Sequence, residues 1–325
     1  MDNNAKLRPL YLAKILYERT DEDHYLTTMQ LAQILEAEYG IPSHRQTIKT
    51  DIELLQQFGM DIQEVKSTQN RYNLISRQFE IAELKLLIDA VQSSKFISKE
   101  RSEQMVSKIV TLAGQHKAEE LKRNASVEGR VKSENRQDLL IVDAINEAIN
   151  ARKKIAFQYF AYNIRKQKKL RHDGERYIFS PYRLIWNGDY YYVLGYSDKH
   201  QAIGSFRVDR ISARPDILSE EAVPVPADFG VDDFLATTFR MYGSECQEIE
   251  LICDNSVIDA IIDRFGTDVT IYACDMSTFR VIARVAISHI FFSWIFGFGG
   301  KVRIKELEKI KTDYKEMVSR ALSSL

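Results

Sequence analysis

Cysteine is scarce in this chain of 325 residues, and its three copies show no metal-binding spacing. Cys246, Cys253 and Cys274 form no CxxC pair and no Cys/His ligand pattern, so the sequence predicts no zinc site. We expect these thiols to be reduced, which is typical of a cytoplasmic protein.

An excess of charge of one sign is also missing. The chain has 45 Lys and Arg residues against 46 Asp and Glu residues, so its total charge attracts neither nucleic acid nor an anionic membrane. Any basic binding surface must therefore be local. The start, MDNNAKLRPL, contains no apolar signal-peptide core, and the most apolar run, Ile290–Gly299, is shorter than the ~20 residues that span a bilayer. We expect a soluble protein of the cytoplasm.

Short catalytic motifs are absent as well. The sequence has no GxxxxGK[ST], GxGxxG, HExxH or GxSxG, the motifs that indicate an NTPase, a dehydrogenase, a metalloprotease or a hydrolase. His172 with Asp173, and Asp198 with His200, are neighbours in predicted turns and do not define an acid–base pair. We predict that the protein is not an enzyme and uses no cofactor or metal.

The apolar pattern predicts three helices and a β-hairpin in residues 1–76. The helices are expected at Leu7–Thr20, Thr27–Tyr39 and His44–Phe58, and the strands at Ile62–Val65 and Arg71–Ile75, on either side of a polar tip at residues 67–70. Three helices followed by a hairpin predict a winged helix-turn-helix.

The third of these helices has a polar face opposite its apolar face. Ser43 offers an oxygen that can cap its first turn. The phrase IPSHRQTIKTDIELLQQFGMDI resembles the DeoR-type helix-turn-helix found in front of WYL domains in transcriptional regulators. That resemblance implies that the helix enters the major groove of DNA while basic groups hold phosphates. We predict these DNA-binding residues: Ser43, His44, Arg45, Gln46, Lys49, Thr50, Lys66 and Arg71.

The alternative for this region is a helical protein-interaction module. Residues 1–76 contain 8 Lys and Arg against 11 Asp and Glu, and this net charge of −3 is poor for a DNA-binding domain. Many of the acids, namely Asp21, Glu22, Asp23, Glu36 and Glu38, lie outside the third helix and the hairpin. Those two elements can therefore still present a basic face.

Residues 77–136 predict a helical connector without a catalytic site. Phe79–Ser93 and Ser98–Ala113 have amphipathic helical patterns, and Gly114 ends the second. Lys117–Arg136 is polar and rich in charges, which suits a linker or an exposed helix. We expect a hinge between the predicted DNA-binding domain and the rest of the chain.

Residues 137–215 predict a small, mostly antiparallel β domain that follows a helix over Leu139–Asn150. The phrases SPYRLIWNGDYYYVLGY and SFRVDRI closely resemble the WYL domain, with Tyr191, Tyr192 and Val193 where the family has Trp-Tyr-Leu. The resemblance implies a β-barrel of the SH3 or Sm type that senses a ligand, proposed to be a nucleotide or a nucleic-acid fragment.

The composition of this domain agrees with such a ligand. Between Arg152 and Arg176, nine Lys and Arg residues accompany only two acids and are interleaved with aromatic residues. Aromatic faces can stack bases while cations hold phosphates. The alternative is that the tyrosines belong to the barrel core and the lysines to a solvated turn.

Arg207 and Arg210 in SFRVDRI match two arginines of the family, and a guanidinium is well shaped for bidentate phosphate contact. Three positions apart on a strand, they point to opposite sides, so one can pair with Asp209 or another acid, and we favour Arg207 for the ligand. Hydroxyl groups nearby can donate to the same anion. The predicted ligand-binding residues are Ser180, Tyr182, Tyr192, Arg207 and Arg210.

Residues 216–244 predict a linker, and residues 245–325 predict an α+β domain. In that domain IELICD, DVTIYAC, FRVIARVAI and SWIFGFGGKVRI alternate with helices over Val257–Phe265 and Leu307–Leu325. This order resembles the C-terminal extension of WYL regulators, called WCX, which implies a ferredoxin-like fold. The aromatic residues from Phe291 to Phe298 indicate core or subunit packing.

The whole sequence predicts a multidomain α+β protein that regulates transcription in response to a ligand. It is expected to bind a double-stranded DNA operator as a homodimer, since helix-turn-helix proteins commonly bind paired half-sites. One alternative is an RNA- or single-strand-binding protein whose WYL barrel is the main site, and another is an adaptor whose barrel binds a peptide. Salt-dependent binding to its own upstream DNA distinguishes the regulator from both.

Overall fold

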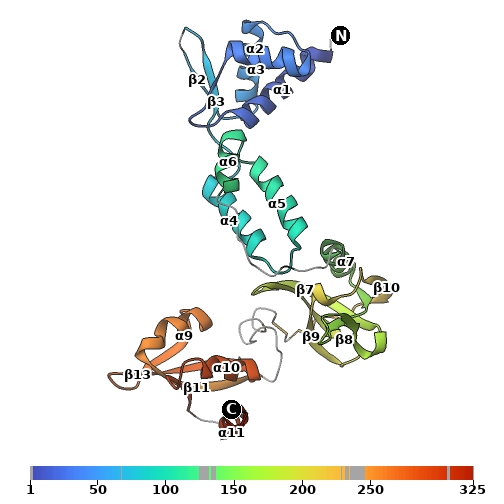
Figure 1. The fold of residues 1–325 in the computed structure, drawn as a ribbon, viewed down its shortest axis with the longest axis vertical. Helices are drawn as coiled ribbons and strands as arrows, with labels where there is room; N and C mark the ends of the chain where they lie inside the picture. The colour runs from blue at the N-terminus through green and yellow to red at the C-terminus, as the bar shows by residue number, and fades with distance from the viewer. Residues whose placement is uncertain are drawn as a thin grey trace. The chain divides into compact units, whose positions relative to one another are not determined.

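The computed structural model describes residues 3–66, 68–123, 132, 137–227, 229–230, 234, 246–305 and 308–324. The chain divides into two compact units, Met1–Arg136 and Gln137–Leu325. Helices dominate the first unit and sheets the second, so the architecture is multidomain α+β (Figure 1). Across the ranges just given, no helix has both the length and the apolar character needed to cross a membrane.

Three helices and a three-stranded antiparallel sheet begin the first unit. The helices are α1 (Asn3–Arg19), α2 (Thr28–Tyr39) and α3 (Arg45–Gln57), and the strands are β1 (Leu26–Thr27), β2 (Ile62–Val65) and β3 (Arg71–Leu74), in the order β1-β3-β2. They share one apolar core, which includes Leu12, Leu31, Ile48, Ile52 and Tyr72. The helices and hairpin lie where the periodicity predicts them, and β1 is an addition too short to show alternation. Ser67, part of the predicted tip, lies outside the described residues.

The two helices α2 and α3 begin differently. Thr27 and Gln30 form a capping box at α2, in which the Thr27 hydroxyl accepts from the backbone N–H of Gln30 and the Gln30 side chain accepts from that of Thr27. At α3 the N-cap residue is His44, whose side chain makes no cap hydrogen bond. The predicted Ser43 cap is wrong, because the Ser43 hydroxyl donates back to the carbonyl of Ile41 at 3.2 Å.

A buried ion pair fixes α3 against α1. Arg8 Nε donates to Asp51 Oδ2 at 2.5 Å, and the side chain of Asp51 is only 6% exposed. A buried carboxylate without a partner costs several kcal/mol, so the two helices are held in one relative position by this pair.

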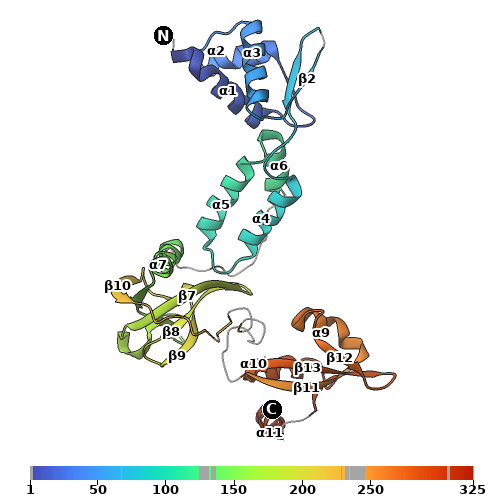
Figure 2. The same ribbon diagram turned by 180° about the vertical axis from the view of Figure 1, so that it is seen from behind.

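Three further helices complete the first unit: α4 (Ile81–Ser93), α5 (Lys99–Thr111) and α6 (Gln115–Arg123). Figure 2 shows α4 and α5 side by side, and Leu84, Ile88 and Val110 lie in their common core. The start of Lys117–Arg136 is thus helical, while residues 124–131 and 133–136 lie outside the described ones.

Arg77 joins these helices to the first three. Its guanidinium donates to the carbonyls of Tyr17 and Thr20, each at 2.7 Å, and to that of Leu112 at 3.4 Å. Carbonyl groups at helix ends lack intrahelical partners, so one cation here satisfies groups at the ends of both α1 and α5.

The second unit begins with α7 (Asp138–Ala151) and a five-stranded antiparallel sheet. The strands are β4 (Lys153–Phe157), β7 (Tyr177–Asn187), β8 (Tyr190–Ser197), β9 (Ala202–Arg207) and β10 (Asp216–Glu221), in the order β10-β4-β7-β8-β9. A separate two-stranded hairpin, β5 (Phe160–Tyr162) and β6 (Lys168–Leu170), is inserted between β4 and β7.

Two predictions for this region differ from the structure. Strand pairing among the described residues does not close the sheet into the expected barrel, because β9 ends in the 3-10 turn Val208–Arg210 and Ile211 then makes only one bridge, to Tyr159. Residues 216–221, predicted as linker, instead form β10 on the edge of β4.

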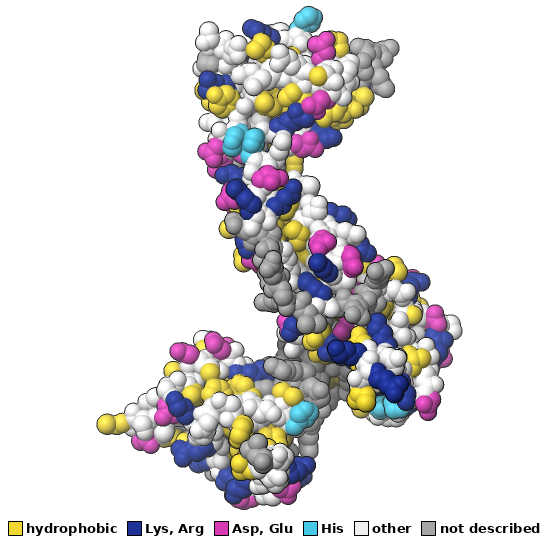
Figure 3. Space-filling model, viewed as in Figure 1, with side chains coloured by type: hydrophobic (Ala, Val, Ile, Leu, Met, Phe, Trp, Pro, Cys, Tyr) yellow, Lys and Arg dark blue, Asp and Glu magenta, His cyan; other side chains and the backbone are white. Residues whose placement is uncertain are grey.

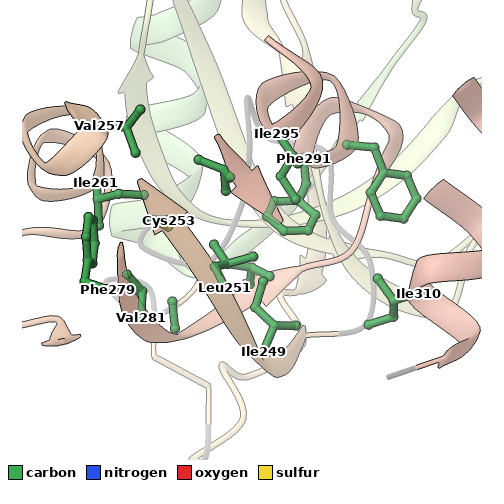
Figure 4. Close-up of a cluster of buried hydrophobic side chains, with 14 residues drawn as sticks. Ile249, Leu251, Cys253, Val257, Ile261, Phe279, Val281, Phe291, Ile295 and Ile310 are labelled. Atoms are coloured by element: carbon green, nitrogen blue, oxygen red, sulfur yellow. The ribbon is translucent and has the colours of Figure 1, made fainter. Parts of the chain in front are cut away.

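The remaining elements form an α+β layer with its own core (Figure 4). They are β11 (Cys246–Asp254), α9 (Ile258–Phe265), β12 (Thr270–Ala273), β13 (Thr278–Ala286), α10 (His289–Phe296), β14 (Val302–Ile304) and α11 (Glu308–Leu322), with strand order β12-β13-β11-β14. The aromatic run predicted to lead into a strand is helical instead. Ser288 caps α10 by accepting from the N–H of Phe291, which places Phe291, Phe292 and Ile295 in the core.

Replacing Arg8 by Ala should open α3. The variant leaves the Asp51 carboxylate buried without its cation, and we expect the free energy of local opening to fall by about 3 kcal/mol. Hydrogen exchange of the α3 backbone amides measures this. The double variant Arg8→Met with Asp51→Leu is the control, since it removes both charges and should recover most of the protection. Unchanged exchange in Arg8→Ala would contradict the role of this pair.

Candidate functional site

The outer face of α3 is polar and accessible. His44, Arg45, Gln46 and Thr50 are exposed and Lys49 is half-buried, whereas the inner face of the helix packs into the core. The Thr50 hydroxyl donates to the carbonyl of Gln46 one turn earlier, and Lys49 lies 3.9 Å from Glu53, an exposed pair that leaves its ammonium available. Amide, imidazole and cationic groups are thus aligned on one exposed helix face.

A hollow of about 530 Å³ lies between the hairpin and the start of α2, and polar groups dominate its lining. The guanidinium of Arg71 stacks 4.2 Å from the centre of the Tyr25 ring, and Lys66 is exposed on the same hairpin. The lining residues are Tyr25, Thr27, Met29, Gln30, Thr68, Gln69 and Arg71. Sequence reasoning found Arg71 but missed Tyr25 and Gln30, because nothing in their local pattern indicates that the hairpin reaches them.

Three acids of this region are engaged away from the exposed face of α3, which itself carries Glu53 beside Lys49. Asp51 is paired with Arg8, Glu38 lies 2.6 Å from Arg19, and Asp21 accepts from His24 at 2.7 Å. Burial alone would raise the pKa of Asp21, but hydrogen bonds from the His24 side chain and the N–H of Asp23 lower it. The net negative charge of residues 1–76 is therefore not concentrated on the exposed face of α3.

In the second unit, both predicted arginines lie close to one carboxylate, that of Asp209. Arg207 Nε and Nη2 donate to the two oxygens of Asp209 at 3.0 and 2.7 Å, and Arg210 Nε lies 4.0 Å from the same carboxylate. The expectation that the arginines point to opposite sides of a strand is wrong, because the strand ends at Arg207 and the 3-10 turn brings Arg210 round to Asp209.

Aromatic rings enclose this arginine pair. Arg207 stacks 3.3 Å from the centre of the Tyr190 ring, and its backbone N–H donates to the Tyr159 hydroxyl at 3.2 Å. Burial raises the pKa of Tyr159 to about 12, so its hydroxyl stays protonated. Burial alone would lower the pKa of Arg207, but the hydrogen bonds and charge of Asp209 outweigh it and raise that pKa.

Ser180 and Tyr182 hold the chain that leaves the sheet. Ser180 is fully buried, and its hydroxyl accepts from the N–H of Val223 at 3.0 Å. The Tyr182 hydroxyl donates to the carbonyl of Pro224 at 3.1 Å. These two predicted ligand residues are therefore occupied by the protein itself.

Tyr192 lies on the same face of the sheet and is also partly covered. It packs with Ile185 and Leu194, against which the rings of Phe229 and Phe234 lie. Its strand neighbour in β9 is Arg207. The structure thus brings Tyr192 next to Arg207, as predicted, but within a face that the chain's own segment covers.

The β5–β6 hairpin carries a second group of cations and rings. Lys168 lies 4.8 Å from the centre of the Phe160 ring, and Arg210 lies 5.0 Å from that of Tyr162. Figure 3 shows Lys and Arg side chains on the body that bears β7 to β10. No group of three or more His, Cys, Asp and Glu residues positioned to bind a metal occurs in the described part of the chain.

Comparison with protein families decides the nature of the middle sheet. Residues 141–214 match the model of the WYL domain. The chain contains a WYL domain. It comprises α7, β4, the β5–β6 hairpin, β7, β8 and β9 and ends just before β10.

The other comparisons add little. No curated protein matches the chain. Among solved structures it is similar to the proteasome accessory factor B/C (PafBC) of Arthrobacter aurescens, with 16% identity and a TM-score of 0.30. The match covers 99% of this chain and 48% of the other, so this chain spans about half of that protein's length.

Replacing Arg207 by Ala should destabilise the WYL domain, because it leaves the Asp209 carboxylate, 10% exposed, with only a distant cation. We expect a loss of about 2–3 kcal/mol, below the full value for a buried pair because Arg207 is partly exposed. Hydrogen exchange of the β8 and β9 amides measures the loss. The matched control, Arg207→Gln with Asp209→Asn, removes both charges and should lose less. Equal loss in the two variants would show that the charge of Asp209 is not the cause.

Proposed function

We propose that this protein is a ligand-responsive, sequence-specific DNA-binding regulator of transcription. It would act by binding a double-stranded operator through its N-terminal helices and an effector through its WYL domain, without catalysing a reaction. The observation that carries the proposal is the exposed polar face of α3, next to a β-hairpin and fixed to α1 by a buried ion pair, in the same chain as a WYL domain.

The arrangement of the first three helices supports a winged helix-turn-helix. An α-helix fits the major groove, and amide or cationic side chains on its exposed face can recognise base edges. Gln46 and Arg45 lie on the first turn of α3, and Lys66 and Arg71 lie on the hairpin that would serve as the wing. Acids paired elsewhere leave this face without strong repulsion for phosphates.

The effector would be phosphate-bearing, a nucleotide or a nucleic-acid fragment. The WYL domain offers Arg207 and Arg210 with stacked aromatic rings, which suits planar and anionic groups. For the last domain, the β11–α9–β12–β13–α10–β14 order supports the ferredoxin-like fold of a WCX extension. Footprinting on the DNA upstream of the gene, at several salt concentrations, tests the proposal. Protection of a defined site would support it, whereas binding to RNA or a peptide alone would favour the alternatives.

Gln46→Ala and Lys49→Ala should impair operator binding in different ways. Loss of an amide that contacts a base edge should cost about 1–3 kcal/mol at one position and relax the base preference there. Loss of a phosphate contact should instead weaken binding evenly across sequences and make the salt dependence shallower by about one unit of slope. Competition footprinting with single-base operator variants separates the two effects. Parent-like footprints for both variants would exclude α3 as the recognition helix.

The protein should also be a dimer, since paired half-sites require two-fold symmetry. Sedimentation of the full chain should give twice the monomer mass of 37.6 kDa. The Phe296 ring on α10 is 56% exposed, and Phe296→Lys should weaken dimerisation about tenfold or more if it packs between subunits. Met276→Lys, at a side chain that is 99% exposed, is the control and should have no effect. A monomeric parent would contradict the prediction.

A further inference from the structure

Cations of the WYL domain fall into two groups. Four of those on and beside the sheet have carboxylate partners: Lys154 with Asp198, Arg176 with Asp216, Lys199 with Glu175, and Arg214 with Glu147. Those on the β5–β6 hairpin do not, since within the described residues Arg165, Lys166, Lys168, Lys169 and Arg171 form no ion pair. Residues 160–174 hold these five cations and one acid, Asp173, a net charge of 5 − 1 = +4. Among the described residues, no carboxylate forms an ion pair with these five cations.

Aromatic rings lie among these cations. Phe160 is buried beneath Lys168, while the ring of Tyr162 is 45% exposed with Arg210 5.0 Å from its centre. Arg171 lies 5.7 Å from the centre of the Tyr159 ring. An exposed ring beside several cations offers stacking and phosphate contacts within the length of one short hairpin.

The hairpin is also held in a defined shape. In its turn the Asn163 side chain accepts from the N–H groups of Arg165 and Gln167, both at 2.9 Å. At its base the N–H of Arg171 donates to the carbonyl of Tyr159 at 2.8 Å, and Gln158 donates to that of Gly174 at 2.6 Å. A preformed backbone lowers the entropic cost of binding, because the positions of the cations are set before a ligand arrives.

The other candidate binding site is the sheet face with Ser180, Tyr182 and Tyr192, and the protein itself covers most of it. The hydroxyls of Ser180 and Tyr182 are hydrogen-bonded to the backbone of Val223 and Pro224. Phe229 and Phe234 cover the apolar part of the face. At its margin Arg207 is already bound by Asp209 through two hydrogen bonds. A polyanion would have to displace these internal partners, whereas on the hairpin it would displace only water and counterions.

We propose that the β5–β6 hairpin, together with Arg210, is the binding track for single-stranded nucleic acid. Lys168 is opposite Tyr162 in the hairpin and shares its face, and Arg210 lies 5.0 Å from the centre of that ring. These two cations would contact the phosphates on either side of one unpaired base stacked on Tyr162. A duplex keeps its bases stacked on one another and cannot offer one to Tyr162, and a mononucleotide is too short to engage cations along the hairpin. This inference rests on the proposed function, because it assigns the effector to a site.

Anisotropy titration of the full chain tests the proposal, with a fluorescein-labelled single-stranded DNA of twelve nucleotides and an RNA of the same sequence as probes. We expect saturable binding that weakens as salt rises. Lys168→Gln should lower the affinity about tenfold or more and reduce the slope of log K against log salt by about 0.7, the value for one phosphate contact. Lys169→Gln makes the same change in charge on the opposite face of the hairpin, and Arg176→Gln makes it at a paired cation. Both controls should leave affinity and slope close to those of the parent.

The ring makes a separate contribution. Tyr162→Leu should lower the affinity about five- to hundredfold without changing the salt slope, because it removes stacking and no charge. Tyr162→Phe keeps the ring and should bind like the parent. Circular dichroism of every variant excludes loss of fold.

If a probe binds, three outcomes would overturn the proposal. They are equal losses in Lys168→Gln and Lys169→Gln, parent-like binding by Tyr162→Leu, or loss of binding only when Arg207 is replaced by Gln. The last would place the strand on the Arg207 face and leave the proposed effector class standing. No binding of either probe would remove the hairpin site and the nucleic-acid effector together. Operator footprinting, which needs no effector, would still decide separately whether the protein is a DNA-binding regulator.

Discussion

The carboxylate of Asp209 must be paired, because it is buried in the WYL domain. Arg207 meets this requirement with two hydrogen bonds, and the 3-10 turn after β9 brings Arg210 to the other side. The same turn ends the strand and leaves Ile211 with a single bridge to Tyr159. The local chain path and the side chains left for a ligand thus follow from one buried charge. Arg210, stacked on Tyr162, remains the more accessible of the two for an anion.

A second constraint comes from the chain that follows β10. Its backbone N–H and C=O groups need partners as it crosses the sheet, and the hydroxyls of Ser180 and Tyr182 supply two of them. Polar residues of a family motif, such as Ser180 and Tyr182, can therefore stabilise the fold instead of binding a ligand. The cations without internal partners then become the better indication of a binding site, and on this domain five that form no ion pair among the described residues lie together within residues 165–171.

Internal pairing also matters in the N-terminal helices and hairpin, where the paired groups to consider are the acids. Residues 1–76 carry a net charge of −3, which is unfavourable for DNA, yet Asp51, Glu38 and Asp21 each have a partner within this segment. A sum of charges treats every acid as free, whereas a nearby phosphate experiences only those that are exposed and unpaired. The position of charge, and not its total, therefore decides whether the α3 face is compatible with a polyanion.

The sequence by itself determined where the three helices and the β2–β3 hairpin of residues 1–76 lie, though not β1, and the SPY and SFRVDRI phrases located the WYL domain. Apolar periodicity and helix capping depend on residues a few positions apart, so they can be recognised from the sequence alone. Tertiary structure decided that Ser180 binds Val223, that Arg8 pairs with Asp51, and that α10 replaces an expected strand. In each of the first two pairs the two residues are 43 positions apart in the sequence, and no local pattern encodes a contact over such a separation. Which buried polar atoms meet at about 3 Å depends on how the apolar faces pack, and only the folded chain specifies that.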